Sequence, residues 1–258
     1  MILPPLENKL TALKLTTVAS CIEQSCKDAN IDLLSITDFL ESILDKQIEH
    51  NRAVSATRMR RFAALRWPDA TLANSAELRA VIKPAVFTHI QSCGWLDQKA
   101  HVLIEGPTGS GKTHLACAIG NEVIANGFRV QFFRYRDLLI RLVAAEKEGE
   151  LRAMLKKLLR IDVIIIDDWV SDKLTHEEQA VLFEFIEKRE KRASLVITTQ
   201  FETKVLHKAV GGDTIADAIL DRIVPMSYRL SLNHDIAFRS IKAASDVKKK
   251  VQKEAENV

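Results

Sequence analysis

The sequence predicts an α/β fold in which a parallel five-stranded sheet is flanked by helices and preceded by a small all-helical N-terminal domain. From about residue 76 onward, short apolar runs alternate with helical stretches, as in a parallel sheet that is covered on both faces. Before that point the periodicity is helical only, and no glycine occurs before Gly94. We expect the helical domain at residues 1–68, a linker at 69–76, the α/β domain at 77–245 and a charged tail at 246–258.

The N-terminal helices are predicted from the spacing of apolar residues. Leu6, Leu10 and Leu13 step by four and three residues, and the register then shifts, so we expect a break near Lys14. The stretch SITD, Ser35 to Asp38, has the pattern of a capping box and predicts the start of a further helix. Its predicted buried stripe consists of Ile36, Phe39, Leu40, Ile43, Leu44 and Ile48.

The stretch from Asn51 to Trp67 is rich in arginine and contains no acidic residue. Its arginines are Arg52, Arg58, Arg60, Arg61 and Arg66. Such a run is suited to DNA phosphates, which it would contact by charge and with release of counterions. A solvated basic face or a protein-docking surface would also explain it. The stretch WPDATLANS that follows has no periodicity and is typical of a linker.

The predicted strands of the α/β domain are short apolar runs separated mostly by helical stretches. They are His101–Glu105, Arg129–Arg134, Asp162–Asp168, Ser194–Gln200 and Tyr228–Leu232. The final residues, KAASDVKKKVQKEAENV, are highly charged and predict a frayed helix or tail.

The loop GPTGSGKT, Gly106 to Thr113, fits the phosphate-binding pattern G-x-x-x-x-G-K-[ST] and lies between a predicted strand and a predicted helix. Glycines let such a backbone curl around a polyphosphate, so that amide N–H groups and the positive helix end face the anion. We expect Lys112 to reach the β- and γ-phosphates and the Thr113 hydroxyl to bind Mg²⁺. The candidate ATP-binding residues are Gly106, Pro107, Thr108, Gly109, Ser110, Gly111, Lys112, Thr113 and His114. The alternative is a chance glycine-rich turn.

The run VIIIDD ends in two carboxylates about 55 residues after the phosphate loop. A carboxylate at the end of a strand beside the loop can hold Mg²⁺, and a second one can orient and deprotonate the attacking water. We assign Asp167 to the first role and Asp168 to the second. A pair of acids at the start of a surface loop is the alternative.

Composition excludes several classes of protein. Four cysteines, Cys21, Cys26, Cys93 and Cys117, show no zinc-site spacing, which favours reduced thiols in the cytoplasm. The first residues do not resemble a signal peptide, and no apolar run is long enough to cross a membrane. The net charge of +3 is mild, so its distribution says more than its size.

Together these motifs resemble the AAA+ ATPases, and more narrowly the IstB-like helper ATPases of insertion-sequence transposition, which are close to the DnaC-type helicase loaders. LENKLTALKL, SITDFLESILDKQIEHN and RMRRFAALRW are similar to the N-terminal region of that family. GPTGSGKTHLACAIGNEVIANGFRVQFF, RIDVIIIDDWV, EEQAVLFEFIEKREKRASLVITTQ and IADAILDRI are similar to its ATPase core, in the right order. The resemblance implies that residues 77–245 form an AAA+ ATPase domain.

The resemblance also implies roles for residues outside the phosphate loop. Thr199 and Gln200 match the strand end that senses the γ-phosphate in this family. Polar residues that only cap a core strand would give the same sequence pattern. Arg222 matches an arginine finger that acts on the nucleotide of a neighbouring subunit, although an arginine on an amphipathic helix is often solvated. Arg134 and Arg136 match a DNA-facing part of the core, and Arg239 is a candidate second sensor.

The resemblance implies an ATP- and Mg²⁺-dependent ATPase that oligomerises on duplex DNA and delivers or activates a transposase. A membrane is not among the implied partners. A DnaC-type helicase loader is the alternative with the same core. Two further alternatives are a small-molecule kinase and a purely structural DNA-binding protein. The kinase would need an acceptor pocket and a basic lid. The structural protein would bind DNA regardless of nucleotide.

Overall fold

The computed structural model describes residues 4–25, 35–72, 84–169 and 174–232. The chain divides into two compact units, residues 1–58 and 59–258, so the division lies before the predicted boundary at residue 68. The predicted C-terminal tail, Cys26 and Arg239 lie outside the described residues. None of the helices in the described ranges is long and apolar enough to cross a membrane.

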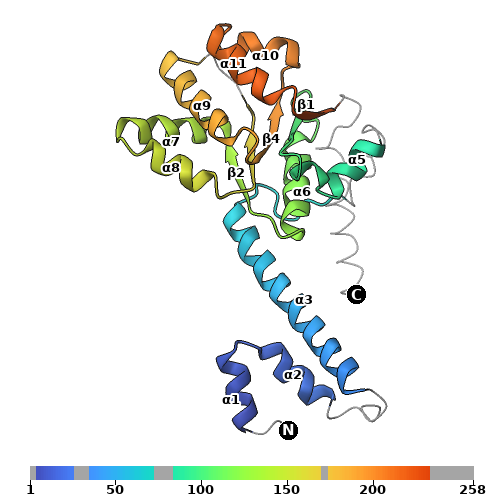
Figure 1. Cartoon of the computed structure of the whole chain (residues 1–258). Coiled ribbons are helices and arrows are strands. Elements are labelled where there is room, and N and C mark those ends of the chain that lie inside the picture. Colours follow the sequence, from blue (N-terminus) through green and yellow to red (C-terminus); the bar gives the residue numbers. More distant parts are fainter. Residues whose placement is uncertain (1–3, 26–34, 73–83, 170–173, 233–258) are drawn as a thin grey trace, which may run out of the picture. The chain divides into compact units, whose positions relative to one another are not determined.

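The N-terminal unit contains α1 (Pro4–Ala12), α2 (Thr16–Ser25) and the first part of α3 (Ile36–Ala63) (Figure 1). The predicted break near Lys14 is confirmed, since Lys14 has a φ of 59° between α1 and α2. The predicted cap is also confirmed, because the Asp38 N–H donates to Ser35 Oγ at 3.1 Å at the start of α3. A small core of Leu10, Val18, Cys21 and Ile43 holds this unit together.

The predicted apolar stripe of α3 is wrong for most of its members. Ile43 is buried and Phe39 is partly buried, whereas the other four are exposed. These four are Ile36, Leu40, Leu44 and Ile48. The buried face instead continues to Gln47, whose Oε1 accepts from the Val18 N–H at 3.2 Å. The two short helices α1 and α2 cover only a narrow strip of α3, so a broad apolar stripe cannot be buried in this unit.

The second unit contains the predicted parallel sheet of five strands, each within one residue of its predicted position at either end. They are β1 (His101–Glu105), β2 (Val130–Arg134), β3 (Val163–Asp167), β4 (Ser194–Thr199) and β5 (Ser227–Ser231). Their order across the sheet is β2-β3-β4-β1-β5, and every pairing is parallel. All residues of β1, β3 and β4 are buried, which explains why each of these strands has an apolar centre with polar residues only toward its ends.

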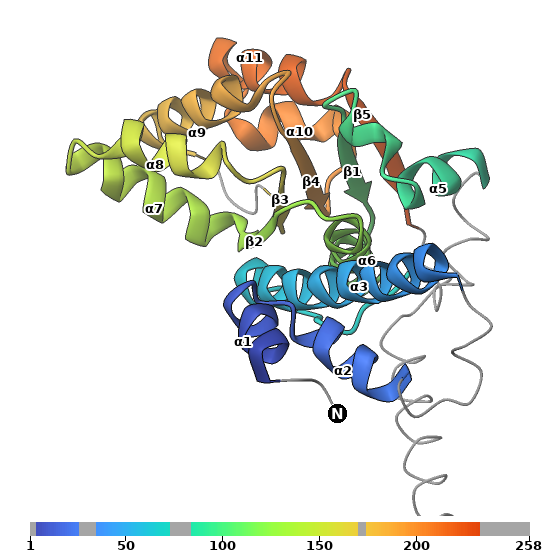
Figure 2. The same ribbon diagram turned by 60° about the horizontal axis from the view of Figure 1, so that its bottom comes forward.

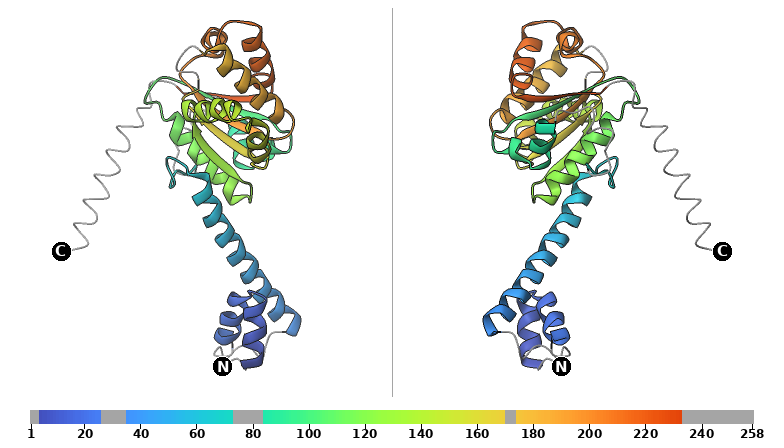
Figure 3. Two further views of the ribbon diagram at one scale, coloured as in Figure 1. Left: turned by 90° about the vertical axis from the view of Figure 1, so that its left-hand side faces the viewer. Right: turned by 90° about the vertical axis from the view of Figure 1, so that its right-hand side faces the viewer.

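Helices cover both faces of the sheet (Figures 2 and 3). The helices of this unit are α5 (Pro84–Gln91), the 3₁₀ helix η2 (Gly94–Leu96), α6 (Lys112–Ala125), α7 (Tyr135–Lys147), α8 (Leu151–Leu158), α9 (His176–Arg189), α10 (Thr203–Val210) and α11 (Thr214–Ile223). On one face α6 packs against the sheet, with Gly120 close to Ile165. On the other face Ile164 and Ile166 join a large core with α7, α9 and α11.

The parallel sheet brings distant parts of the sequence to one edge, because the carboxyl ends of all five strands point the same way. The phosphate loop follows β1, Asp167 ends β3 and Gln200 follows β4. β4 lies between β1 and β3, so its end is adjacent to both of the others. The described cysteines Cys21, Cys93 and Cys117 are buried and free.

Candidate nucleotide-binding site

The phosphate loop connects buried β1 directly to the N-terminus of α6. A Cβ at Gly106 would lie 2.6 Å from the Leu232 carbonyl oxygen and 2.9 Å from Ser110 Oγ, so only glycine fits this close approach. Gly111 precedes the helix with a φ of 90° and no side chain caps the first turn. Ser110 Oγ is buried and has no hydrogen-bond partner among the described residues. The loop therefore has both the backbone path and the unpaired polar groups suited to a phosphate chain.

Lys112 folds back over the phosphate loop. Its side chain is buried, and Nζ donates a hydrogen bond to the Pro107 carbonyl oxygen at 2.8 Å. Burial lowers the pKa of Lys112, while the charges of Asp168 and Asp167 oppose that shift. The ammonium group is thus held over the loop on a single backbone carbonyl, from which it can turn to a phosphate.

Asp167 connects the phosphate loop with β3 and β4. Its Oδ1 accepts from Thr113 Oγ1 at 2.8 Å and from Thr198 Oγ1 at 2.7 Å. Burial raises the pKa of Asp167, and the two hydroxyls and Arg66 oppose that rise. Oδ2 accepts no hydrogen bond in the described ranges, and Arg66 Nη1 lies 3.7 Å from it. A fully buried carboxylate with one unsatisfied oxygen is suited to a cation.

Asp168 begins the loop after β3 in a left-handed conformation with a φ of 57°. Its N–H donates to Thr198 Oγ1 at 2.9 Å, the same hydroxyl that donates to Asp167. Such a conformation is uncommon for a residue with a side chain and is held here by surrounding contacts. Thr198 therefore orients both acids, and our sequence reasoning missed it. The available signal was a pair of threonines, Thr198 and Thr199, at the end of a buried strand.

Gln200 is brought to the phosphate loop. Thr108 Oγ1 donates to Gln200 Oε1 at 2.9 Å, and the Gly106 N–H donates to the Thr199 carbonyl oxygen at 3.3 Å. Thr199 itself turns inward, where its hydroxyl donates to the Trp169 carbonyl oxygen at 3.3 Å. Of the two residues that were expected at this strand end, Gln200 contacts the phosphate loop, whereas the Thr199 side chain binds the backbone after β3.

The segment directly after α3 also contributes to the site. Asn121 Nδ2, on α6, donates to the carbonyl oxygens of Pro68 and Ala70 at 2.8 and 2.9 Å. The ring of Trp67 lies 6.4 Å from that of His114, the residue after the loop. The first residues of the predicted linker thus pack on the helix that begins at the phosphate loop, which composition alone did not indicate.

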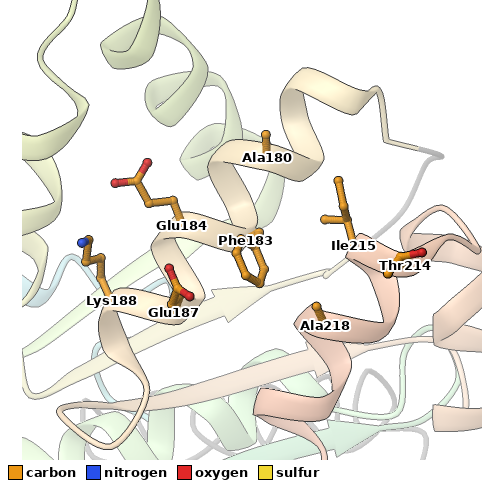
Figure 4. Close-up of a pocket in the computed structure, with 8 residues that line it drawn as sticks. All are labelled: Ala180, Phe183, Glu184, Glu187, Lys188, Thr214, Ile215 and Ala218. Atoms are coloured by element: carbon orange, nitrogen blue, oxygen red, sulfur yellow. The ribbon is translucent and has the colours of Figure 1, made fainter.

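Arg222 lies at the opposite edge of the sheet, since α11 leads into the first residue of β5. Its guanidinium donates to the Ala218 carbonyl oxygen at 2.7 Å, pairs with Glu190 at 3.2 Å and Glu187 at 3.6 Å, and lies over the ring of Phe183. A shallow cavity of about 570 Å³ opens beside it between α9 and α11 (Figure 4). This placement separates Arg222 from the phosphate loop of its own chain.

The arginines expected to contact DNA fall into three groups. Arg52, Arg58, Arg60 and Arg61 are exposed along α3. Arg134 is exposed at the end of β2, whereas Arg136 pairs with Glu178 of α9 at 2.8 Å. Arg66 is the member that lies at the nucleotide site.

The donor set fits Mg²⁺ held together with a nucleotide. Nowhere in the described part of the chain do three His, Cys, Asp or Glu side chains gather into a metal-binding cluster. Mg²⁺ does not need one, because it is usually bound by one or two carboxylates together with substrate phosphates and water. Asp167 and the Thr113 hydroxyl, already hydrogen-bonded to each other, supply the protein's part of such a site.

The strand order, the phosphate loop and the aspartate at the end of β3 define a P-loop protein with an AAA+ core. The particular family follows from the sequence comparison, in which the IstB-like ATP-binding proteins match residues 8–244. The chain belongs to this family. It is therefore an ATP-binding protein of AAA+ fold, as the resemblance implied.

Similar proteins support this membership over nearly the whole chain. One relative, named as an insertion sequence ATP-binding protein, is y4pL of Sinorhizobium fredii, 28% identical over 233 residues that cover 90% of this chain and 95% of the relative. Another from the same organism, y4iQ/y4nD/y4sD, bears the same kind of name and is 32% identical over 220 residues, or 83% and 72% of the two chains.

Solved structures share the fold of the second unit. The DnaC helicase loader is 23% identical with a TM-score of 0.54, and the match covers 66% of this chain and 99% of that one. AMPPCP-bound DnaA from Aquifex aeolicus is 20% identical with a TM-score of 0.52, over 69% and 54% of the two chains. These likenesses confirm the predicted fold class.

Proposed function

We propose that this protein is a cytoplasmic ATPase that oligomerises on duplex DNA in its ATP-bound form and acts as a helper of transposition, delivering or activating a transposase at target DNA. The observation that carries the ATPase part is the 2.8 Å hydrogen bond between Thr113 and Asp167. It joins the phosphate loop to the aspartate that ends β3, and hydrolysis of a nucleotide requires both parts.

The chain's own residues bind the nucleotide in this proposal. The amides of the phosphate loop and the N-terminus of α6 surround the phosphates, and Lys112 moves from the Pro107 carbonyl to the β- and γ-phosphates. Thr113 and Asp167 hold Mg²⁺, which when bound neutralises charge on the phosphate oxygens. Trp67 and His114 flank the same end of α6.

Hydrolysis needs a base and a group that positions the water. Asp168 accepts the proton of the attacking water, and the hydrogen bond from its N–H to Thr198 holds its backbone in place. Gln200, which Thr108 holds at the loop, orients the water. The products are ADP and phosphate, and the proton of the water passes to the Asp168 carboxylate.

Arg222 completes the site of a neighbouring subunit. It lies at the edge of the sheet opposite its own phosphate loop, so it can serve a nucleotide only in trans. The fork of its guanidinium complements charge on the transferred phosphoryl group. It is paired with Glu187 and Glu190 in the single chain, and assembly would exchange these partners for the nucleotide.

The DNA and transposase parts of the proposal have separate support. Exposed arginines on α3 can neutralise phosphates without reading bases, which favours binding that is largely independent of sequence. The relatives bear the name of insertion sequence ATP-binding proteins, which suggests a role beside a transposase. Similarity to DnaC shows the fold alone and does not favour a helicase loader.

The proposal is tested by measuring complex mass by light scattering on matched single- and double-stranded DNA with ATP, ADP or no nucleotide. We expect large complexes on duplex DNA with ATP only, and their loss in Lys112→Ala. Preference for single strands, or DNA binding only with a helicase, would favour the helicase loader. DNA binding that is the same with and without nucleotide would contradict the switch.

Mixing two inactive variants tests Arg222 separately. We expect Arg222→Ala to lower the ATPase rate by about a hundredfold or more, whereas Arg192→Ala, an exposed arginine after α9, leaves it unchanged. Lys112→Ala subunits carry an intact Arg222, so adding them to Arg222→Ala subunits should restore part of the activity. No restoration in mixed complexes would show that Arg222 does not act in trans.

A further inference from the structure

Arg66 differs from the other arginines of its run because it lies against a buried acid. Its Nη1 is 3.7 Å from Asp167 Oδ2, the carboxylate oxygen that accepts no hydrogen bond within the described ranges. The Arg66 side chain is 44% exposed and Asp167 is fully buried. Arg60 and Arg61, only a few residues earlier, are exposed on α3.

The backbone around Arg66 is fixed to the helix of the phosphate loop. Leu65 and Ala70 are buried on either side of it. Asn121 of α6 holds the carbonyls of Pro68 and Ala70, and no other side-chain amide in the described chain makes two such bonds to this segment. The hydrogen bonds between this segment and α6 therefore place the backbone of Arg66 beside Asp167. The partly exposed guanidinium of Arg66 can still turn.

We propose that Arg66 is a residue of the nucleotide site, where it balances the charge of Asp167 in the metal-free protein and competes with Mg²⁺ for that carboxylate. This inference rests on the proposed function, because it requires a nucleotide and Mg²⁺ at Asp167. Two cations at one carboxylate repel each other, so bound Mg²⁺ turns the guanidinium away from Asp167. The half-exposed side chain turns away easily, since ion pairs that reach solvent are weak.

The competition predicts opposite effects on the nucleotide and on the metal. Without Mg²⁺, Arg66 contributes positive charge beside the carboxylate of Asp167, so it strengthens binding of the free polyphosphate. With a saturating nucleotide, it opposes the entry of Mg²⁺. A residue that only supported the fold of this segment would instead weaken both when removed.

The test is equilibrium binding of a fluorescent, non-hydrolysable ATP analogue, first without Mg²⁺ and then as a Mg²⁺ titration at saturating analogue. We expect Arg66→Ala to weaken metal-free binding and to lower the Mg²⁺ concentration at half-saturation, each by about fivefold. Arg66→Lys keeps the charge and should remain near the wild type in both measurements. Arg61→Ala is the matched control from the same run and should change neither.

Each outcome decides between the possibilities. A Mg²⁺ midpoint that is unchanged or raised in Arg66→Ala would overturn the proposal, and a matching thermal unfolding midpoint would show that the variant is folded. If the wild-type chain bound no analogue at any Mg²⁺ concentration, the proposed function itself would fail. If the wild type bound the analogue and Arg61→Ala moved the midpoint as much as Arg66→Ala, the effect would be one of general charge.

Discussion

A buried charge lies at each end of strands β3 and β4, Arg189 of α9 at their beginning and Asp167 of β3 at the other end, and the two differ in what their hydrogen bonds hold. At the beginning of the strands, Arg189 donates to the carbonyl oxygens of Leu158, Ile161 and Ser194 at 2.8, 3.1 and 2.8 Å, with a longer bond to Asp162. At the other end, Asp167 uses Oδ1 for two hydroxyls and leaves Oδ2 without a hydrogen bond in the described chain.

The difference separates a structural charge from a functional one. Arg189 donates to carbonyl oxygens of the α8–β3 connection and of β4. Its hydrogen bonds therefore stabilise the backbone where the two strands begin. Burial lowers the pKa of Arg189 to about 9, with Asp162 opposing the shift, so the guanidinium stays charged near neutral pH. Each group keeps one buried atom without a hydrogen bond in the described chain, Nε of Arg189 and Oδ2 of Asp167. Only Oδ2 lies beside the phosphate loop, which Asp167 contacts through Thr113, so a ligand can still add bonding there.

The first prediction concerns the structural end, where we expect the largest effect. Arg189→Leu removes the donor for four carbonyl oxygens, three of them in buried hydrogen bonds. Leaving buried acceptors unpaired costs roughly 1–3 kcal/mol each before relaxation. We expect the free energy of unfolding to fall by about 4 kcal/mol, as measured by urea denaturation followed by circular dichroism.

Arg192 provides the matched control, because it is exposed a few residues later. Arg192→Leu should change the free energy of unfolding by less than about 0.5 kcal/mol. A similar loss in both variants would show that Arg189 does not hold the beginning of the strands as described. Nucleotide affinity of the folded fraction should be unchanged in Arg189→Leu, since this end does not contribute to the site.

The second prediction concerns His101, which begins β1 at the same end of the sheet and accepts a hydrogen bond from the Leu195 N–H on Nδ1 at 3.2 Å. Burial, with a smaller effect of the Arg189 charge, lowers the pKa of His101 to about 4. Between pH 6.5 and 4 the unfolded chain therefore binds a proton that the folded chain does not, so stability falls as the pH falls. The loss from this group is about 3 kcal/mol.

Substitution of His101 by asparagine separates this loss from other titrations. His101→Asn keeps an acceptor for the Leu195 N–H and removes the titrating ring. Urea denaturation at pH 7.5 and pH 4.5 should show a smaller loss of stability in the variant than in the wild type. His176→Asn, which changes an exposed histidine, should behave as the wild type does. Equal losses in all three proteins would contradict a neutral buried His101.

The strands and the phosphate loop were predictable from the sequence because each depends on local signals. Buried parallel strands read as apolar runs, and the loop has fixed glycine and lysine positions within eight residues. The break at Lys14 and the Ser35 cap are also local. The stripe of α3 was mispredicted because periodicity shows which residues share a face and does not show how much of that face a neighbouring helix covers.

The missed residues depend on contacts between distant parts of the chain. Thr198 reaches Asp167 and Asp168 because β4 pairs with β3, a neighbour relation that the strand order sets and the sequence does not state. Arg189 stands in the charged stretch EKREKR and looks like a solvated residue until its carbonyl partners are placed. Arg66 was grouped with the arginines of α3, and only the fold of the following segment brings it to Asp167.

The third prediction concerns the functional end and has the smallest effect on stability, with the opposite sign. Burial raises the pKa of Asp167 above its ordinary value, so the folded chain holds this proton to higher pH than the unfolded chain does. Stability contributed by this group therefore falls as the pH rises through that window, and at neutral pH the ionised carboxylate destabilises the nucleotide-free fold. Asp167→Asn should stabilise the nucleotide-free protein by about 1 kcal/mol at pH 7.5.

The same variant should lose the dependence of nucleotide binding on Mg²⁺, because the amide cannot replace the carboxylate as a ligand of the metal. Its gain in stability should shrink as the pH falls, since the wild-type carboxyl then takes up its proton and becomes neutral as well. Urea denaturation at pH 7.5 and 4.5 without nucleotide measures both differences. A loss of stability at pH 7.5 would show that Asp167, like Arg189, is held mainly for the fold. A gain together with lost Mg²⁺ dependence would show that the two ends of β3 keep buried charges for different reasons.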